Sequence, residues 1–216
     1  GPIKNKPLVL PDGTLLSGSS REAERWTVHF ERSPDGGRSW EEVEPPPAPG
    51  IDAIQPSLLT HGGGRLQAVG RSRQGRLFST WSEDAGLTWS PLELLEVPNP
   101  NSGTDAVSLA DGRHLLVYNP TTAPAAEWGG PRTPLSLAVS GDGRQWRRVV
   151  DLETQPGEYS YPAIIQAADG LVHVTYTWRR QRIRHRVVDP ACLPAGEASA
   201  FHVKQTSAAG VPPQEE

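Results

Sequence analysis

Apolar and polar residues alternate in short stretches along this chain, and a glycine interrupts these stretches at nearly regular intervals. The pattern of strand, tight turn and strand recurs at Leu8 to Leu16, Leu58 to Gln67, Val107 to Val117 and Ile164 to Val174. The turn glycines are Gly13, Gly64, Gly112 and Gly170, so that neighbouring turns lie 51, 48 and 58 residues apart. Alternation with a period of two predicts half-buried strands, and glycine supplies the positive φ that tight hairpin turns require. The chain is therefore predicted to be all-β and built from a repeated unit.

A second motif recurs with the same period. It reads Ser-Pro-Asp-Gly-Gly-Arg-Ser-Trp from Ser33 to Trp40, Ser-Glu-Asp-Ala-Gly-Leu-Thr-Trp from Ser82 to Trp89, and Ser-Gly-Asp-Gly-Arg-Gln-Trp from Ser140 to Trp146. An aspartate in such a turn hydrogen-bonds the backbone of its own turn, and the closing tryptophan packs the turn down. This motif is the Asp-box, or BNR repeat. We interpret its aspartates as structural residues rather than catalytic ones.

A period near 50 residues fits one four-stranded propeller blade, with the Asp-box between the third and fourth strands. The sequence predicts a β-propeller with about four antiparallel blades, at residues 1–48, 49–98, 99–153 and 154–190. The fourth blade has three expected strands, at Ala163 to Gln166, Val172 to Trp178 and Ile183 to Val188, and lacks an Asp-box. Its closing strand is expected from upstream sequence or from residues near Phe201 to Val203. Residues 191–216 are expected to form a partly disordered tail.

Composition and charge exclude several classes of function. The 216 residues carry a net charge of −4, whereas a nucleic-acid or anionic-membrane surface needs a basic footprint. The sequence contains no apolar run long enough for a membrane span. Cys192 is the single cysteine and no metal-ligand spacing occurs, so neither a metal nor another cofactor is expected.

Propeller geometry predicts where a site should lie, because the first strand of each blade begins, and the second strand ends, at the same end of the axis. Polar and aromatic side chains gather at these positions. The first strands begin near Asn5 and Lys6, Gln55, Asn101 to Asp105, and Tyr159 with Tyr161. The second strands end near Arg21 and Glu22, Arg71 and Arg73, Tyr118 and Asn119, and Trp178 and Arg179. We expect a pocket of carbohydrate size at this end.

The chain resembles bacterial sialidase-like proteins of the BNR/Asp-box superfamily from about Ile3 to Asp189. Besides the Asp-boxes, the phrases that carry the resemblance are Ile3-Lys4-Asn5-Lys6-Pro7, Gln55-Pro56-Ser57, Gly70-Arg71-Ser72-Arg73, Asn99-Pro100-Asn101-Ser102-Gly103 and Glu158-Tyr159-Ser160-Tyr161-Pro162. The resemblance implies a six-bladed propeller, of which about two N-terminal blades would lie upstream. It also implies a secreted or periplasmic protein that acts on a glycan or an acidic monosaccharide.

The resemblance further implies roles for individual residues. Sialidases bind the substrate carboxylate with three arginines, because guanidinium groups match a carboxylate bidentately. Arg71 resembles the second of these and Arg132 the third, while the first would lie upstream. Tyr159 resembles the family's tyrosine nucleophile, which is an exception among glycosidases. The strand ends described above, rather than the resemblance, mark the remaining residues expected to contact substrate, which are Asn101, Asp105, Glu22, Tyr118 and Tyr161.

One departure from the family pattern concerns the general base. A phenol has an unperturbed pKa of about 10 and needs a neighbouring base to attack at neutral pH. The family uses a glutamate, but the matching residue here is Gln55, which cannot accept a proton. Glu158 or Glu22 would have to replace it. Two hypotheses therefore stay open, a sialidase-like exo-glycosidase and a non-catalytic carbohydrate-binding or scaffold propeller. We expect no hydrolysis by the isolated chain, and self-association is possible.

Overall fold

A computed structural model describes residues 4–124 and 127–193 of the chain, which form four antiparallel sheets arranged as the blades of a β-propeller. The order of strands in each blade follows the sequence from the innermost strand outward. Blade 1 contains β1 (Leu8–Val9), β2 (Leu15–Glu22), β3 (Trp26–Ser33) and β4 (Glu41–Val43). Blade 2 contains β5 (Ala53–Thr60), β6 (Leu66–Ser72), β7 (Arg76–Ser82) and β8 (Glu93–Pro98).

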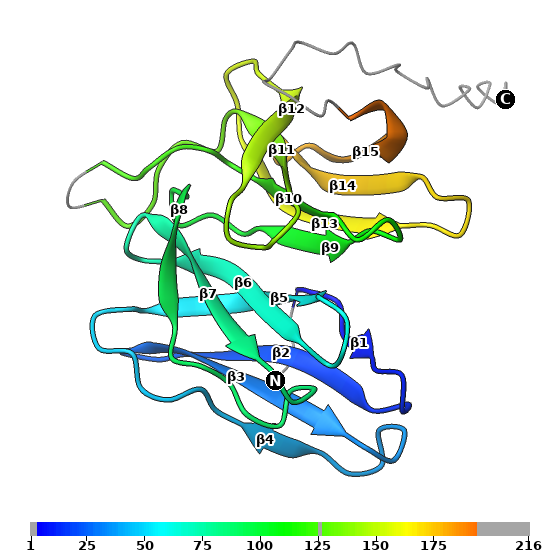
Figure 1. Ribbon diagram of the computed structural model, residues 1–216. Coiled ribbons are helices and arrows are strands. Elements are labelled where there is room, and N and C mark those ends of the chain that lie inside the picture. Colours follow the sequence, from blue (N-terminus) through cyan, green and yellow to red (C-terminus); the bar gives the residue numbers. More distant parts are fainter. Residues whose placement is uncertain (1–3, 125–126, 194–216) are drawn as a thin grey trace, which may run out of the picture.

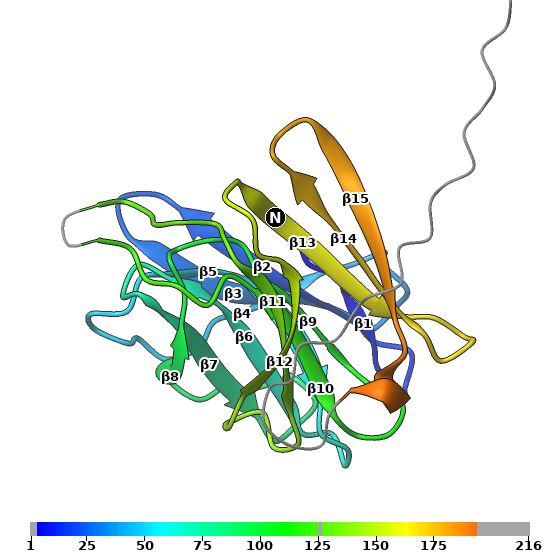
Figure 2. The same ribbon diagram turned by 90° about the horizontal axis from the view of Figure 1, so that it is seen from above.

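Blade 3 contains β9 (Asp105–Ser108), β10 (His114–Tyr118), β11 (Leu135–Ser140) and β12 (Arg147–Glu153). Blade 4 contains β13 (Tyr159–Gln166), β14 (Val172–Trp178) and β15 (Arg182–Val188), and a 3-10 turn, η1 (Pro190–Cys192), follows it. Figures 1 and 2 show the four blades following one another in chain order, from blue to orange. The predicted all-β propeller is confirmed. The segment near Phe201 to Val203 lies outside the described residues, as does most of the expected tail.

The hydrophobic core consists of three clusters, one between each pair of successive blades. Phe30 of blade 1 stacks on Trp89 of blade 2 with ring centroids 3.7 Å apart. Leu77 of blade 2 belongs to the same cluster as Leu116 of blade 3, and blades 3 and 4 share a third cluster around Tyr176. Each blade is thus stabilised by its neighbours rather than by an interior of its own. No helix among the described residues is long and apolar enough to span a membrane.

The Asp-boxes form the tight turns that the sequence predicts. In blade 2, Asp84 Oδ1 accepts hydrogen bonds from Ser82 Oγ at 2.8 Å and from the backbone N–H of Thr88 at 2.8 Å. In blade 1, the hydrogen bonds from Ser39 lower the pKa of Asp35 to about 2. These carboxylates are occupied within their own turns, as expected of structural residues.

A β-bulge in β13 decides which tyrosine of blade 4 faces outward. Tyr159 pairs with Trp178 and Ser160 with Thr177, but Ala163 pairs with Thr175, so that one extra residue lies between them on β13. A bulge exchanges the two faces of a strand. Tyr159 is consequently fully buried in the cluster shared with blade 3, whereas Tyr161 is 48% exposed.

Candidate functional site

The four blades place equivalent residues around one end of the axis. Lys4, Gln55, Gly103 and Tyr161 each lie nine residues before the turn glycine of their blade, and the strand pairings align them. Lys4, Gln55 and Tyr161 have positive φ values of 73°, 57° and 49°. We call these four residues the axis ring. A left-handed residue bends the chain where it enters the innermost strand, so the ring side chains stand outside the regular ladder.

The Lys4 side chain connects this ring to blades 3 and 4. Its ammonium donates hydrogen bonds to Asn5 Oδ1 at 3.0 Å, to the Pro162 carbonyl at 3.1 Å and to the Thr104 carbonyl. Burial lowers the pKa of Lys4 to about 8; Asp105 acts in the opposite direction, and the nearby charges of Arg71 and Lys6 lower the pKa further. The sequence pattern could have revealed Lys4, because the nine-residue spacing holds in all four blades.

Arg71 lies near the end of β6 and is buried, with 4% of its surface exposed. Its Nη1 donates to the carbonyl of Asn101 at 3.0 Å, while its buried Nε has no acceptor among the described residues. Burial lowers the pKa of Arg71, the charges of Glu22 and Tyr161 raise it, and the charge of Arg132 lowers it. Glu22, Tyr161 and Arg132 are thus all close enough to act on this guanidinium.

Arg132 reaches the same place from the segment before β11. Its guanidinium carbon lies 5.4 Å from the centroid of the Tyr161 ring. Its buried Nη1 is also without an acceptor in the part of the chain that the structure describes. Two guanidinium groups from different blades, each with an unused N–H, therefore converge beside an accessible phenol. An unpaired buried donor costs free energy unless a ligand supplies the acceptor.

Tyr159 occupies a different environment from Tyr161. Its hydroxyl lies against Gly157 and the side chain of Arg179, because a Cβ built on Gly157 would stand 3.1 Å from both Tyr159 Oη and Arg179 Nε. The hydroxyl is buried and lacks a hydrogen-bond partner among the described residues. The structure therefore brings Tyr161, rather than the fully buried Tyr159, to the open side of the arginine pair.

Two of the residues considered for the base position, Gln55 and Glu158, are poorly suited to accept the phenolic proton. Gln55 is buried, its backbone carbonyl accepts a hydrogen bond from Asn5 Nδ2 at 2.8 Å, and its Oε1 has no donor among the described residues. The Glu158 carboxylate accepts hydrogen bonds from Arg180 Nε at 2.7 Å and Ser160 Oγ at 3.0 Å. Burial raises the pKa of Glu158, but these bonds outweigh it and the net pKa is lowered, which makes Glu158 a weak base.

Asp105 joins the blades rather than facing an opening. Its carboxylate pairs with Lys6 at 3.0 Å and accepts hydrogen bonds from Ser57 Oγ at 2.9 Å and the Ile164 N–H at 2.9 Å. Four blades thus meet on one carboxylate. Tyr118 packs into the core between blades 2 and 3, where burial raises its pKa. Asn101 lies at the site, because its backbone carbonyl accepts the hydrogen bond from Arg71.

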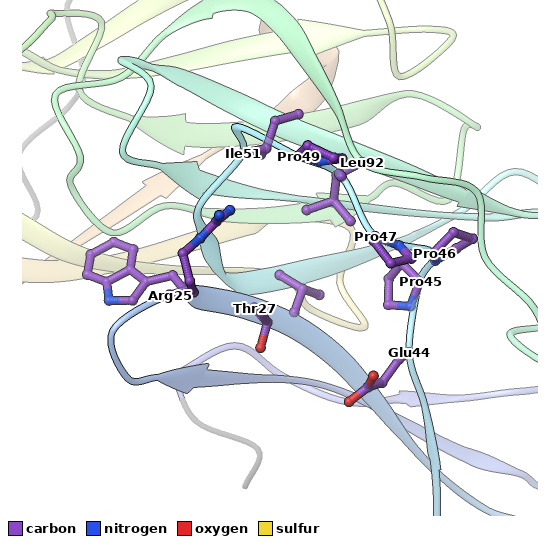
Figure 3. Close-up of a pocket in the computed structure, with 12 residues that line it drawn as sticks. Arg25, Thr27, Glu44, Pro45, Pro46, Pro47, Pro49, Ile51 and Leu92 are labelled. Atoms are coloured by element: carbon purple, nitrogen blue, oxygen red, sulfur yellow. The ribbon is translucent and has the colours of Figure 1, made fainter.

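The sequence reasoning missed two tryptophans near the site, Trp26 beside Arg71 and Trp128 beside Trp26. The guanidinium carbons of Arg71 and Arg73 lie 5.5 and 4.2 Å from the centroid of the Trp26 ring. Trp128, on the segment between β10 and β11, meets Trp26 edge to face at 6.3 Å. Trp26 is also one of the residues that line a groove. In Figure 3, Arg25 and Thr27 of this groove lie across from Pro45, Pro47 and Leu92. Trp128 lies in a long loop, so no periodic signal in the sequence marked it.

The charge of this end of the axis favours an anionic ligand. Lys4, Arg71, Arg73 and Arg132 supply four cationic side chains, and Lys4 and Arg71 are largely buried. Asp105 is already paired with Lys6, which leaves Glu22 as the carboxylate near Arg71 without a hydrogen bond or ion pair to the described residues. Guanidinium groups bind carboxylates through paired N–H donors, so the arrangement suits a carboxylated ligand.

Comparisons with known proteins agree with this architecture. A model of the BNR repeat-like domain matches residues 1–174. The NanB sialidase of Streptococcus pneumoniae superposes with a TM-score of 0.67 at 16% identity, over 87% of this chain and 31% of the sialidase. A leech intramolecular trans-sialidase gives a TM-score of 0.66 at 17% identity, over 84% of this chain and 30% of its own.

A protein of unknown function from Dyadobacter fermentans gives a TM-score of 0.67 at 19% identity, over 84% of this chain and 51% of its own. A search of curated protein sequences gives no match. The chain spans about a third of the length of the two sialidases. At these identities the likeness concerns the fold.

Proposed function

Because this chain belongs to the BNR repeat-like domain family, we propose that it is part of a sialidase-like glycosidase that binds the terminal acidic sugar of a glycan. The convergence of Arg71 and Arg132 beside Tyr161 carries the proposal. Each guanidinium has a buried N–H without an acceptor among the described residues, and a sugar carboxylate supplies oxygens for both. The similarity to the fold of sialidases supports the same substrate class.

In this proposal Tyr161 attacks the anomeric carbon. The phenol oxygen forms a bond to that carbon as the glycosidic C–O bond breaks, and the leaving oxygen takes up a proton from solvent water. A second water molecule then attacks the same carbon, which breaks the bond to the phenol oxygen and releases the free sugar. Glu22 accepts the phenolic proton, because its carboxylate is free of partners among the described residues and its charge reaches Arg71. Arg71 and Arg132 hold the sugar carboxylate and orient the ring. Tyr159 supports the site from the core beneath it.

A second function is favoured by Gln55. The side chain at the position of the family's base cannot accept a proton, and Gln55 is buried. A propeller that binds an acidic sugar without cleaving it needs the arginine pair but no base. The two functions predict the same binding and differ in turnover.

The test uses this chain together with any sequence that precedes it in its gene. We expect turnover of at least one member of a panel of sialic and uronic acid glycosides. Replacing Arg71→Ala should lower kcat/KM about 100-fold, since a bidentate charge-assisted contact is lost. Arg76→Ala is the matched control, because Arg76 is an exposed residue of the same blade that pairs with Glu96 at 2.6 Å.

Two tyrosine variants separate the roles within the site. Tyr161→Phe should abolish turnover and leave binding of the free acid nearly unchanged, whereas Tyr159→Phe should retain turnover. Binding of an acidic sugar that Arg71→Ala weakens, with no turnover of any glycoside, would favour the non-catalytic function. Absence of any saccharide binding would reject both.

A further inference from the structure

The ammonium of Lys4 is held by acceptors from three directions. Its three hydrogens meet Asn5 Oδ1 at 3.0 Å, the Pro162 carbonyl at 3.1 Å and the Thr104 carbonyl. An ammonium has three donors and no acceptor, so this set satisfies it completely. Lys4 therefore has no donor left with which to contact a ligand.

Each of these acceptors leads to another residue of the axis ring. The Thr104 and Pro162 carbonyls belong to the residues that directly follow the ring residues of blades 3 and 4. Asn5 Nδ2 donates to the carbonyl of Gln55, the ring residue of blade 2, at 2.8 Å. One ammonium thus ties the ring positions of the other three blades to Lys4.

The hydrogen bond to blade 4 bears directly on Tyr161. This residue has a φ of 49°, a left-handed conformation that is uncommon for an aromatic residue, and Lys4 holds the carbonyl of Pro162 next to it. Gly103 has no side chain to separate the two residues, because a Cβ there would lie 2.8 Å from Lys4 Cε and 3.4 Å from Tyr161 Cδ1. Lys4 therefore supports the bulge that turns Tyr161 outward.

The charge of Lys4 responds to groups from several blades. Burial lowers the pKa of Lys4 to about 8; Asp105 opposes this shift, Arg71 and Lys6 add to it, and the phenol of Tyr161 lies beside the same side chain. A carboxylate held by Arg71 would bring a negative charge that favours the ammonium over the neutral amine. Binding and protonation are linked, so a ligand that favours the ammonium takes up a proton as it binds.

We propose that Lys4 is a positioning residue of the arginine site and that its protonation is coupled to the binding of an acidic sugar. The inference rests on the proposed function, because Arg71 and Arg132 must hold the sugar carboxylate. Lys4 acts through the bulge at Tyr161 and through its charge rather than by touching the sugar. A neutral amine has two hydrogens for three acceptors, so its formation removes one of the bonds that hold the ring. The affinity for acidic sugars therefore falls as the pH rises through the range in which Lys4 loses its proton.

The test measures the binding of N-acetylneuraminic acid by isothermal titration calorimetry, with this chain and any sequence that precedes it in its gene. From about pH 7 to about pH 9.5 the affinity of the wild type should fall about fivefold, the scale of one charge several ångströms away in a partly solvated site. Near pH 8, titrations in phosphate and in Tris, which differ in ionisation enthalpy, should show uptake of a fraction of a proton. Lys4→Met should show neither signal, and its affinity should equal that of the wild type at the highest pH within about twofold. A purely structural loss would instead persist at every pH.

Two further variants separate charge from other causes. Lys4→Arg keeps a cation at every pH, so it should retain most of the affinity seen at low pH and take up no proton. Cys192→Ser replaces the single cysteine, which is exposed, and should leave both signals unchanged; it is needed because thiols as a class ionise within the tested range.

The outcomes distinguish this inference from the proposed function. Equal affinity of the wild type at the lowest and highest pH, without proton uptake, would overturn the coupling and leave the proposed function intact. The same would follow from a loss of affinity in Lys4→Met that is equal at every pH. Absence of binding by the wild type at any pH would overturn the proposed function and the coupling together.

Discussion

At the scale of single residues, equivalent backbone positions carry different chemistry. The axis ring holds an amine, an amide, a glycine and a phenol, although all four residues occupy the same place in their blades. The position in the repeat therefore determines the location of the backbone, whereas the chemistry of the side chain differs from blade to blade. Burial and the charges from neighbouring blades set its properties, as the lowered pKa of Lys4 illustrates.

The pKa of Lys4 predicts a pH dependence of stability. Its pKa is about 8 in the folded chain and about 10.5 without burial. Between these values the unfolded state binds more protons, so the contribution of Lys4 to the free energy of unfolding rises from pH 8 to pH 10.5. Urea denaturation across this range should show the rise in the wild type relative to Lys4→Met. Parallel curves for the two proteins would contradict the prediction.

We expect the conservative substitution of Asp105 by asparagine to destabilise the fold, because four blades meet on the Asp105 carboxylate. Asp105→Asn removes the negative charge that faces Lys6 and one of the acceptors used by Ser57 and Ile164. We expect the free energy of unfolding to fall by about 2 kcal/mol, which is below the cost of breaking a fully buried pair because Lys6 is partly exposed. Chemical denaturation measures it. Glu83→Gln, whose partner Arg65 is also exposed, should cost less than about 0.5 kcal/mol, and an equal loss in both variants would contradict the argument.

At the scale of elements, hairpins and Asp-box turns follow from the sequence because each has a local cause. The turn glycines adopt positive φ as the spacing predicts, and β14 spans the predicted Val172–Trp178. The bulges at Gln55 and Tyr161 could not be predicted, because a bulge shifts the phase of the alternation by one residue and strands of 8 residues are too short to reveal that shift. Sequence reasoning therefore placed Tyr159 and Tyr161 together at the site, and the bulge places them on opposite faces of β13.

Gly70 lies in β6 where the neighbouring strands of blade 2 leave no space for a side chain. A Cβ on Gly70 would lie 2.7 Å from Phe78 Cε1 and 2.8 Å from the Gln55 carbonyl oxygen. Gly70→Ala should therefore destabilise the chain by about 2 to 3 kcal/mol and disturb the site, since backbone must move. Gly141→Ala is the matched control, because a Cβ there meets no atom within 4 Å. Thermal unfolding of both variants would show the difference, and equal melting temperatures would refute the steric argument.

At the scale of the whole molecule, blade 4 differs from the others in its exposed surface. Ile165 is 49% exposed and Ile183 77% exposed on its outward face, and β15 pairs with β14 alone among the described strands. An unpaired edge beside apolar side chains favours association between chains. The sequence repeat predicted the number of blades. No local sequence pattern predicted how much of the surface of blade 4 would be exposed.

This surface predicts a concentration-dependent mass. Light scattering of the isolated chain should give values that rise above 23.4 kDa with concentration. Ile183→Lys should suppress the rise with little change in unfolding free energy, because the side chain is mostly exposed. Val9→Lys, at a position 71% exposed on blade 1, should leave the rise in place. A constant monomer mass for the wild type would show that blade 4 does not associate.

The axis ring also has a consequence for engineering. Codons 4, 55, 103 and 161 specify the four residues around the axis, and the ladder hydrogen bonds of the strands use none of their side chains. Gly103 accepts a larger residue only if the Lys4 side chain shifts away from its hydrogen bonds to blades 3 and 4, since a Cβ there lies 2.8 Å from Lys4 Cε. A combinatorial library confined to codons 55 and 161 would therefore vary ligand preference while Lys4 keeps its hydrogen bonds between the blades.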